Sequence, residues 1–189
     1  MPRTPDFPID PIFTARWSPR AMSGEPVTAE ELQSLFEAAR WAPSSGNNQP
    51  WRIVYASRDT PAFDAFFSLL NEGNQQWCVR AGALLVMVSR TTFDSGTPAR
   101  THSYDTGAAW MSLAIQGSRM GLVVHGMQGF DYDAARETLG IPDGYAVEAM
   151  VAVGRPGRVE DLPAHQQPRE RRNDRKPVAA FAFEGRFRE

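Results

Sequence analysis

The chain has 189 residues, a formal net charge of -2, and 42% hydrophobic and 22% charged residues, the composition of one globular domain spanning 1–189. Its 20 basic residues are spread among 22 acidic ones, which argues against nucleic acid as a partner. No apolar run reaches the ~18 residues of a membrane span, and residues 1–6 lack the apolar segment of a signal peptide, so we expect a cytoplasmic protein.

The N-terminal half should alternate extended and helical segments. Residues 1–12 are rich in proline and are expected to form an extended arm. Thr28 and Glu31 form a capping box that starts a helix, and Pro43 marks its end. A strand over 49–56 should follow. We expect a second helix from Thr60 to near Gly73, with residues 71–76 as a loop.

The C-terminal half continues this alternation. The apolar run 83–89 predicts a strand buried on both faces, followed by a loop over 90–103. The predicted helix 105–120 is apolar on nearly all sides, which indicates one face in the core and another at a subunit interface. We then expect a short strand within 122–131, a helix over 133–139 and a strand over 145–153.

The end of the chain forms a second arm, residues 158–189. Residues 158–176 are polar and rich in arginine, and 178–183 form an apolar, strand-like tail. This tail could bury itself on its own chain or pair with the sheet edge of a partner.

Three stretches carry candidate binding chemistry. In an extended segment, Arg16, Ser18 and Arg20 would project to one side, where they could converge on a phosphate. The alternative is a surface loop whose arginines pair with acids such as Asp10 and Glu25, and the isolated pattern favours this alternative.

The second stretch, residues 42–51, places two serines, three side-chain amides and a glycine between two prolines. It suits either the gripping of a polar ligand or a well-capped connection between helix and strand. In the third stretch, Gly126 and Gly129 could let the backbone approach a ligand or provide a tight turn with positive φ.

Other chemistry is missing from the sequence. There is no G-x-x-x-x-G-K-[ST], G-x-G-x-x-G or G-x-S-x-G motif. The single cysteine, Cys78, is more typical of packing than of a nucleophile, and His102, His125 and His165 show no metal-ligand spacing. An enzyme with this sequence would therefore need a bound cofactor, and we expect no metal.

Taken together and in order, these stretches resemble the FMN-dependent nitroreductase family over roughly residues 12–180. The resemblance implies an α+β sandwich in which helices flank a mostly antiparallel central sheet. It also implies a homodimer with FMN at the subunit interface, in which helix 105–120 lies in the dimer core and the C-terminal arm is exchanged between subunits.

The resemblance also implies roles for particular residues. The FMN phosphate would be held by Arg16, Ser18, Arg20 and Arg175. The segment reaching FMN from the partner subunit would contain Ser44, Ser45, Asn47 and Gln49. The isoalloxazine would pack on Met127, Gln128 and Gly129, with a backbone N–H facing flavin N5. Because that donor is backbone, glutamine at 128, where many relatives have glutamate, should not abolish flavin binding.

The implied function is transfer of hydride from NADH or NADPH through flavin N5 to nitroaromatics, quinones or similar acceptors, by a ping-pong mechanism without a catalytic side chain. The alternatives are a dedicated reduction on the same fold, such as reductive dehalogenation or enone or aldehyde reduction, and a flavin-binding or storage protein with little turnover. Compared with many relatives, segments 71–80 and 90–104 leave little room for a helical cover, which suggests an open or unusual acceptor pocket.

Overall fold

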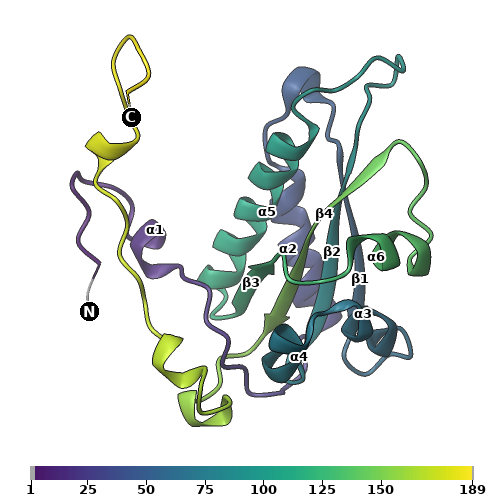
Figure 1. Cartoon of the computed structure of the whole chain (residues 1–189), viewed down its shortest axis with the longest axis vertical. Helices are drawn as coiled ribbons and strands as arrows, with labels where there is room; N and C mark the ends of the chain where they lie inside the picture. Colours follow the sequence, from purple (N-terminus) through teal and green to yellow (C-terminus); the bar gives the residue numbers. More distant parts are fainter. Residues whose placement is uncertain (1–2, 189) are drawn as a thin grey trace.

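The computed structural model describes residues 3–188 and contains one four-stranded sheet (Figure 1). The strands are β1 Trp51–Ser57, β2 Ala83–Arg90, β3 Val123–Met127 and β4 Tyr145–Gly154, in the spatial order β1-β2-β4-β3. All neighbouring pairs are antiparallel, which confirms the predicted α+β fold with an antiparallel central sheet. Residues 83–89 of β2 are buried along their whole length, as the apolar run predicts.

Helices cover both faces of this sheet (Figure 1). Helices α2 Ala29–Arg40 and α5 His102–Arg119 form one core with the sheet, in which Leu35 and Leu113 pack with Leu85. Helices α3 Phe63–Leu69, α4 Glu72–Cys78 and α6 Tyr132–Thr138 lie on the other face, where Phe66 packs with Leu84. Successive β2 residues therefore serve opposite cores, as the two-residue period of a strand requires.

Two predicted helix features can be compared directly with the structure. The capping box is confirmed, because Thr28 Oγ1 accepts from the Glu31 backbone N–H at 3.1 Å and the Glu31 carboxylate accepts from the Thr28 backbone N–H at 2.8 Å. Helix α5 begins three residues before the predicted start at Asp105. Among residues 3–188, no helix has the length and apolar character to cross a membrane.

The loop expected over 71–76 is wrong, because α4 occupies Glu72–Cys78. The Asn71 side chain caps this helix by accepting from the Asn74 backbone N–H at 3.0 Å, and the buried anchors are Trp77 and Cys78 at its end. Its first turns are polar, so they carry no apolar periodicity. The helix expected from Thr60 to Gly73 is correspondingly shorter, since α3 ends at Leu69.

Both arms also differ from the sequence prediction. Residues Pro11–Ala15 form a short helix, α1, capped by Asp10, where part of an extended arm was expected. No strand forms over 178–183; this tail contains a 3-10 turn, Val178–Ala180, and is mostly exposed. The two arms lie together on one side of the sandwich, and the Val178 backbone N–H donates to Asp6 at 3.0 Å (Figure 1).

Candidate functional site

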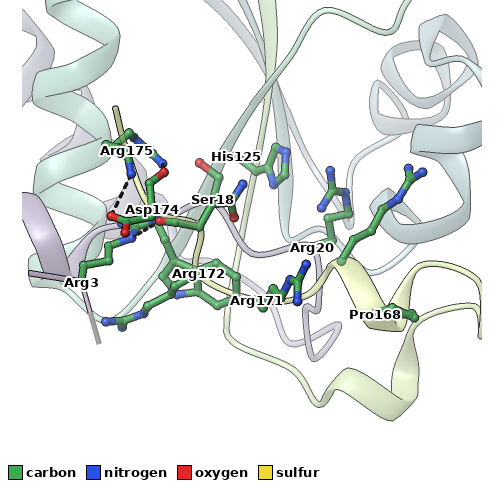
Figure 2. A pocket seen from close by; sticks show the side chains of 12 residues that line it. Arg3, Ser18, Arg20, His125, Pro168, Arg171, Arg172, Asp174 and Arg175 are labelled. Carbon is green, nitrogen blue, oxygen red and sulfur yellow. Dashed lines mark hydrogen bonds between the residues drawn. The ribbon is translucent and has the colours of Figure 1, made fainter. Parts of the chain in front are cut away.

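A cavity of about 790 Å³ lies between residues 17–20, strand β3 and the C-terminal arm (Figure 2). Its wall includes three of the predicted site residues: Ser18, Arg20 and Arg175. The charged residues of its wall are mainly basic, with six arginines and one acidic residue, Asp174. The arginines are Arg3, Arg20, Arg169, Arg171, Arg172 and Arg175.

Two sets of contacts fix the walls of this cavity. Met22 forms an isolated antiparallel bridge with Pro156, which attaches the N-terminal segment to the chain that leaves β4. The Glu170 carboxylate accepts from the backbone N–H groups of Arg20 at 2.8 Å and Ala21 at 2.9 Å. The N-terminal segment and the C-terminal arm are therefore joined beside the cavity, although they lie about 150 residues apart in the sequence.

Arg16 does not line this cavity; it lies next to it and lines a second cavity of about 310 Å³. One of its terminal nitrogens donates to Ser18 Oγ at 3.3 Å, while its Nε is buried and has no hydrogen-bond partner. Burial and then the neighbouring Arg175 lower the pKa of Arg16, and burial followed by Arg175 and Arg16 lowers the pKa of Arg3. A buried donor without a partner among like charges is unfavourable, and a bound anion would offset both costs.

The acids that could have neutralised this segment pair elsewhere. Asp10 contacts Arg119 at 3.5 Å, and Glu25 contacts Arg155 at 3.8 Å. The alternative in which Arg16 and Arg20 pair with these two acids is therefore wrong. Within residues 3–188, neither Arg16 nor the six cavity arginines form an ion pair with a carboxylate, whereas arginines elsewhere do, such as Arg40 with Glu37 at 2.6 Å.

His125 lines the same cavity and was not predicted from the sequence. Its Nδ1 lies 2.9 Å from the Pro19 carbonyl oxygen, which can only accept, so Nδ1 carries the proton. The ring packs on Trp77 at a centroid distance of 4.7 Å. Burial, together with the nearby Arg20 and Arg16, lowers the pKa of His125 to about 4. The imidazole is therefore neutral near pH 7, and a single histidine within a strand gives no sequence signal for this role.

Lowering the pH should destabilise the protein through His125. Its folded pKa of about 4 lies below the ordinary 6.5, so between these values the unfolded chain binds a proton that the folded chain does not. This loss of stability is negligible above about pH 7.5 and grows as the pH falls towards 4, to about 2.5 kcal/mol by pH 4.5. Urea unfolding at pH 7 and 4.5 should show a smaller loss for His125→Phe than for the parent chain. A His165→Gln control, at an exposed position, should keep the full loss; equal losses in all three proteins would contradict the assignment.

The second predicted stretch forms a strained loop between α2 and β1. Gly46, Asn47 and Gln49 have positive φ values of 57°, 54° and 48°. Positive φ is unfavourable for residues other than glycine and often accompanies a functional site. The Ser44 hydroxyl also stabilises the loop from within, because its Oγ accepts from the Gln49 backbone N–H at 3.0 Å. Ligand binding and a well-capped connection therefore both remain compatible with this loop.

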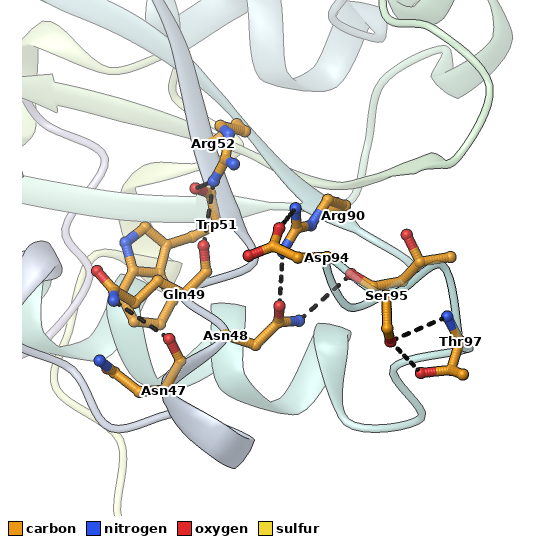
Figure 3. Close-up of polar contacts among 10 residues, drawn as sticks. Asn47, Asn48, Gln49, Trp51, Arg52, Arg90, Asp94, Ser95 and Thr97 are labelled. Carbon is orange, nitrogen blue, oxygen red and sulfur yellow. Dashed lines mark hydrogen bonds and ion pairs between the residues drawn. The ribbon is translucent and has the colours of Figure 1, made fainter.

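A polar network joins this loop to Arg90, at the end of β2 (Figure 3). Arg90 donates to the Asn48 side-chain oxygen at 2.6 Å and to Asp94 at 2.5 Å. The Ser45 backbone N–H donates to Asp105 of α5 at 3.1 Å. The side chains of Ser45, Asn47 and Gln49 are exposed, so the predicted binding groups face away from their own chain's core.

The third predicted stretch, 127–129, closes the end of β3. The Gly129 carbonyl accepts from the Asn71 backbone N–H at 3.0 Å and the Asn74 side chain at 2.9 Å. A Cβ at Gly129 would lie 2.5 Å from the Asn71 amide, and neither Gly126 nor Gly129 has a positive φ. A side chain at either glycine would meet close neighbours, and the tight turn with positive φ is excluded; close approach of a ligand stays a prediction. Met127 is buried against Cys78, at 3.5 Å between the sulfur atoms, while Gln128 is exposed.

The structure therefore gathers some predicted site residues and leaves others apart. Ser18, Arg20 and Arg175 line one cavity, with Arg16 hydrogen-bonded to Ser18. The loop 44–49 and the segment 127–129 do not line that cavity within one chain. In the part of the chain that the structure describes, no group of three His, Cys, Asp or Glu side chains could hold a metal ion.

This combination defines an α+β sandwich with an arginine-lined cavity beside its N-terminal segment. The model of the nitroreductase family matches residues 13–64 and 57–155, and the chain belongs to that family.

Similar proteins agree with this assignment. A crystal structure described as the oxidoreductase containing FMN is 46% identical, has a TM-score of 0.95, and aligns over 98% of this chain and 96% of its own. A nitroreductase family protein from Streptococcus pneumoniae shares the fold, with a TM-score of 0.73 at 17% identity over 92% and 98% of the chains. An NADH dehydrogenase from Thermus thermophilus is 28% identical over 82% of this chain and 90% of its own.

Proposed function

We propose that this protein is an FMN-dependent oxidoreductase that takes hydride from NADH or NADPH and reduces nitroaromatics, quinones or similar electron-poor acceptors. Its membership of the nitroreductase family and the 46% identity to an oxidoreductase described as containing FMN support the proposal.

The observation that carries the proposal is the uncompensated charge around Arg16. Its buried Nε lacks a partner, and Arg175 lies close enough to lower its pKa further. A phosphate dianion would satisfy the donor and relieve the repulsion at once. The residues present therefore fit the FMN phosphate, with Arg16, Ser18, Arg20 and Arg175 as its ligands.

When bound, FMN supplies the redox chemistry by accepting hydride at N5 and passing the electrons to an acceptor. The protein's task is then to bind and orient. The arginines hold the phosphate end, and His125 adds a neutral ring whose Nδ1 is already engaged by the Pro19 carbonyl. Met127, Gln128 and Gly129 remain a prediction for the isoalloxazine contact.

The proposal includes a homodimer in which Ser44, Ser45, Asn47 and Gln49 reach the flavin of the partner subunit. Within one chain, Ser45, Asn47 and Gln49 are exposed. Hydrogen bonds to Arg90 and Asp105 hold their loop in place. The C-terminal arm also exposes large apolar side chains, with Phe181 at 64% and Phe187 at 83%. Exposed apolar area of this kind suits a subunit interface, and supports exchange of the arm between subunits.

Anaerobic reduction tests the function directly. We expect purified protein to be yellow, to release FMN on denaturation, and to lose its flavin absorbance when mixed with NADH or NADPH without oxygen. A colourless protein that cannot be reconstituted with FMN would refute the cofactor assignment. A yellow protein that neither nucleotide bleaches would instead point to a flavin-binding or storage protein.

A further inference from the structure

His125 has one ring nitrogen whose role the phosphate site does not explain. Nδ1 donates to the Pro19 carbonyl, and the ring is neutral near pH 7, so Nε2 carries a lone pair. Within residues 3–188 nothing donates to Nε2, and the fully enclosed atoms that lack a partner lie on other residues. Nε2 is therefore an acceptor open to the cavity that the ring lines.

Two contacts hold this ring in one orientation. The Pro19 carbonyl fixes one edge at 2.9 Å, and the Trp77 ring packs against it at a centroid distance of 4.7 Å. Trp77 is itself only 2% exposed, and its Nε1 donates to the Asn74 side chain at 3.2 Å. An acceptor held in this way loses little conformational entropy when a donor binds to it.

The ring lies between the two parts of the proposed flavin site. Its partner Pro19 stands between Ser18 and Arg20 of the phosphate segment, and Figure 2 shows the ring beside these two residues. Along β3, His125 precedes Met127 by two residues. Both side chains therefore point to the same face of the sheet, about 7 Å apart along the strand.

Contacts with α4 agree with this placement. Trp77 packs against His125, and the next residue, Cys78, contacts Met127 at 3.5 Å between the sulfur atoms. The part of FMN that joins its phosphate to its isoalloxazine is the ribityl chain, which carries hydroxyl groups. A phosphate dianion has no proton to donate to a lone pair, whereas a hydroxyl has one.

We propose that His125 contacts FMN directly, with Nε2 accepting a hydrogen bond from a hydroxyl of the ribityl chain. This contact rests on the proposed function for the presence of FMN. It adds to that function a residue that selects flavins by the hydroxyl groups of their side chain, and the Pro19 carbonyl supports it by keeping the proton on Nδ1.

Calorimetric titration of the flavin-free protein with two flavins tests this contact. One is FMN, and the other is an analogue in which an unsubstituted pentyl chain joins the isoalloxazine to the phosphate. His125→Asn should keep a donor to Pro19, because the asparagine amide can take the place of Nδ1, but it lacks the acceptor. We expect FMN to bind about two- to tenfold more weakly, as for one neutral hydrogen bond, and the analogue to bind unchanged.

Two further variants and a spectrum complete the test. His125→Gln places an amide near the position of Nε2 and should restore part of the FMN affinity. His165→Gln, at an exposed position outside the cavity, should bind both flavins as the parent chain does. In the parent chain, the NMR resonance of His125 Nε2 should move to the range of a hydrogen-bonded nitrogen with FMN, but not with the analogue.

Each result bears on the contact. Equal weakening of FMN and the analogue in His125→Asn would show that the ring only supports the Pro19 segment, and would overturn it. Unchanged FMN affinity in that variant, or an unmoved Nε2 resonance in the parent chain, would overturn it too and leave the cofactor assignment in place. If the parent chain bound neither flavin, the proposed function would fail and the contact with it.

Discussion

Replacing Arg16 by glutamine should weaken FMN binding by about 1.5–3 kcal/mol, or roughly 10- to 150-fold in Kd, because a charged donor to the phosphate is lost. The same change should not destabilise the FMN-free protein, since it removes a half-buried charge whose Nε has no partner and which lies beside Arg175. Flavin fluorescence titration and thermal unfolding, each with and without FMN, measure the two effects separately.

A loss of FMN affinity without a loss of stability in the FMN-free protein distinguishes a ligand-binding arginine from a structural one. Arg119→Gln is a suitable control, because Arg119 is exposed and its ion pair with Asp10 lies outside the cavity. It should leave the FMN affinity unchanged. Unaltered flavin affinity in Arg16→Gln, or a large loss of stability in its FMN-free form, would contradict the phosphate assignment.

Replacing Gly157 by alanine should cost about 3 kcal/mol of unfolding free energy, the upper end of the usual penalty for overpacking. A Cβ at Gly157 would lie 2.4, 2.5 and 2.9 Å from the backbone C, O and N of Met22, and backbone atoms cannot rotate away. Met22 pairs with Pro156 and so fixes the segment that carries Arg16 to Arg20. Urea unfolding should show the loss, and FMN affinity should fall with it.

Gly107→Ala provides the matched control. Gly107 lies within α5, and no atom outside its own stretch of helix lies within 4 Å of the position that a Cβ would occupy. Removing glycine from a helix interior should stabilise the chain by about 0.5–1 kcal/mol. If both alanine variants unfold at the same urea concentration as the parent chain, the tight contact between Gly157 and Met22 does not exist in solution.

Strand β2 and the helices α2 and α5 could be predicted from the sequence because each carries a local signal. These signals are the apolar run of β2, the capping box at Thr28 and the apolar surface of α5. Each can be recognised from neighbouring residues alone. Helix α4 could not be predicted in this way, because its stability comes from burying Trp77 and Cys78 against the rest of the fold.

The candidate site was likewise predicted only in part from the sequence. The alternation of Arg16, Ser18 and Arg20 indicated a phosphate ligand, but the isolated pattern could not exclude pairing with Asp10 and Glu25. The structure decides against that pairing, because both acids contact other arginines. The pairing of β3 with β4 and the contact with the Pro19 carbonyl bring His125 to the cavity, and no local sequence pattern encodes these tertiary relationships.

Comparison of FMN with riboflavin is the most direct test of the central claim, because the two differ only in the phosphate. Calorimetric titration of the flavin-free protein should give an FMN Kd about a hundredfold lower or more than that of riboflavin, as expected for several charge-assisted contacts. That difference should shrink in Arg16→Gln. Equal affinities for FMN and riboflavin in the parent protein would contradict the assignment of Arg16, Ser18, Arg20 and Arg175 as a phosphate site.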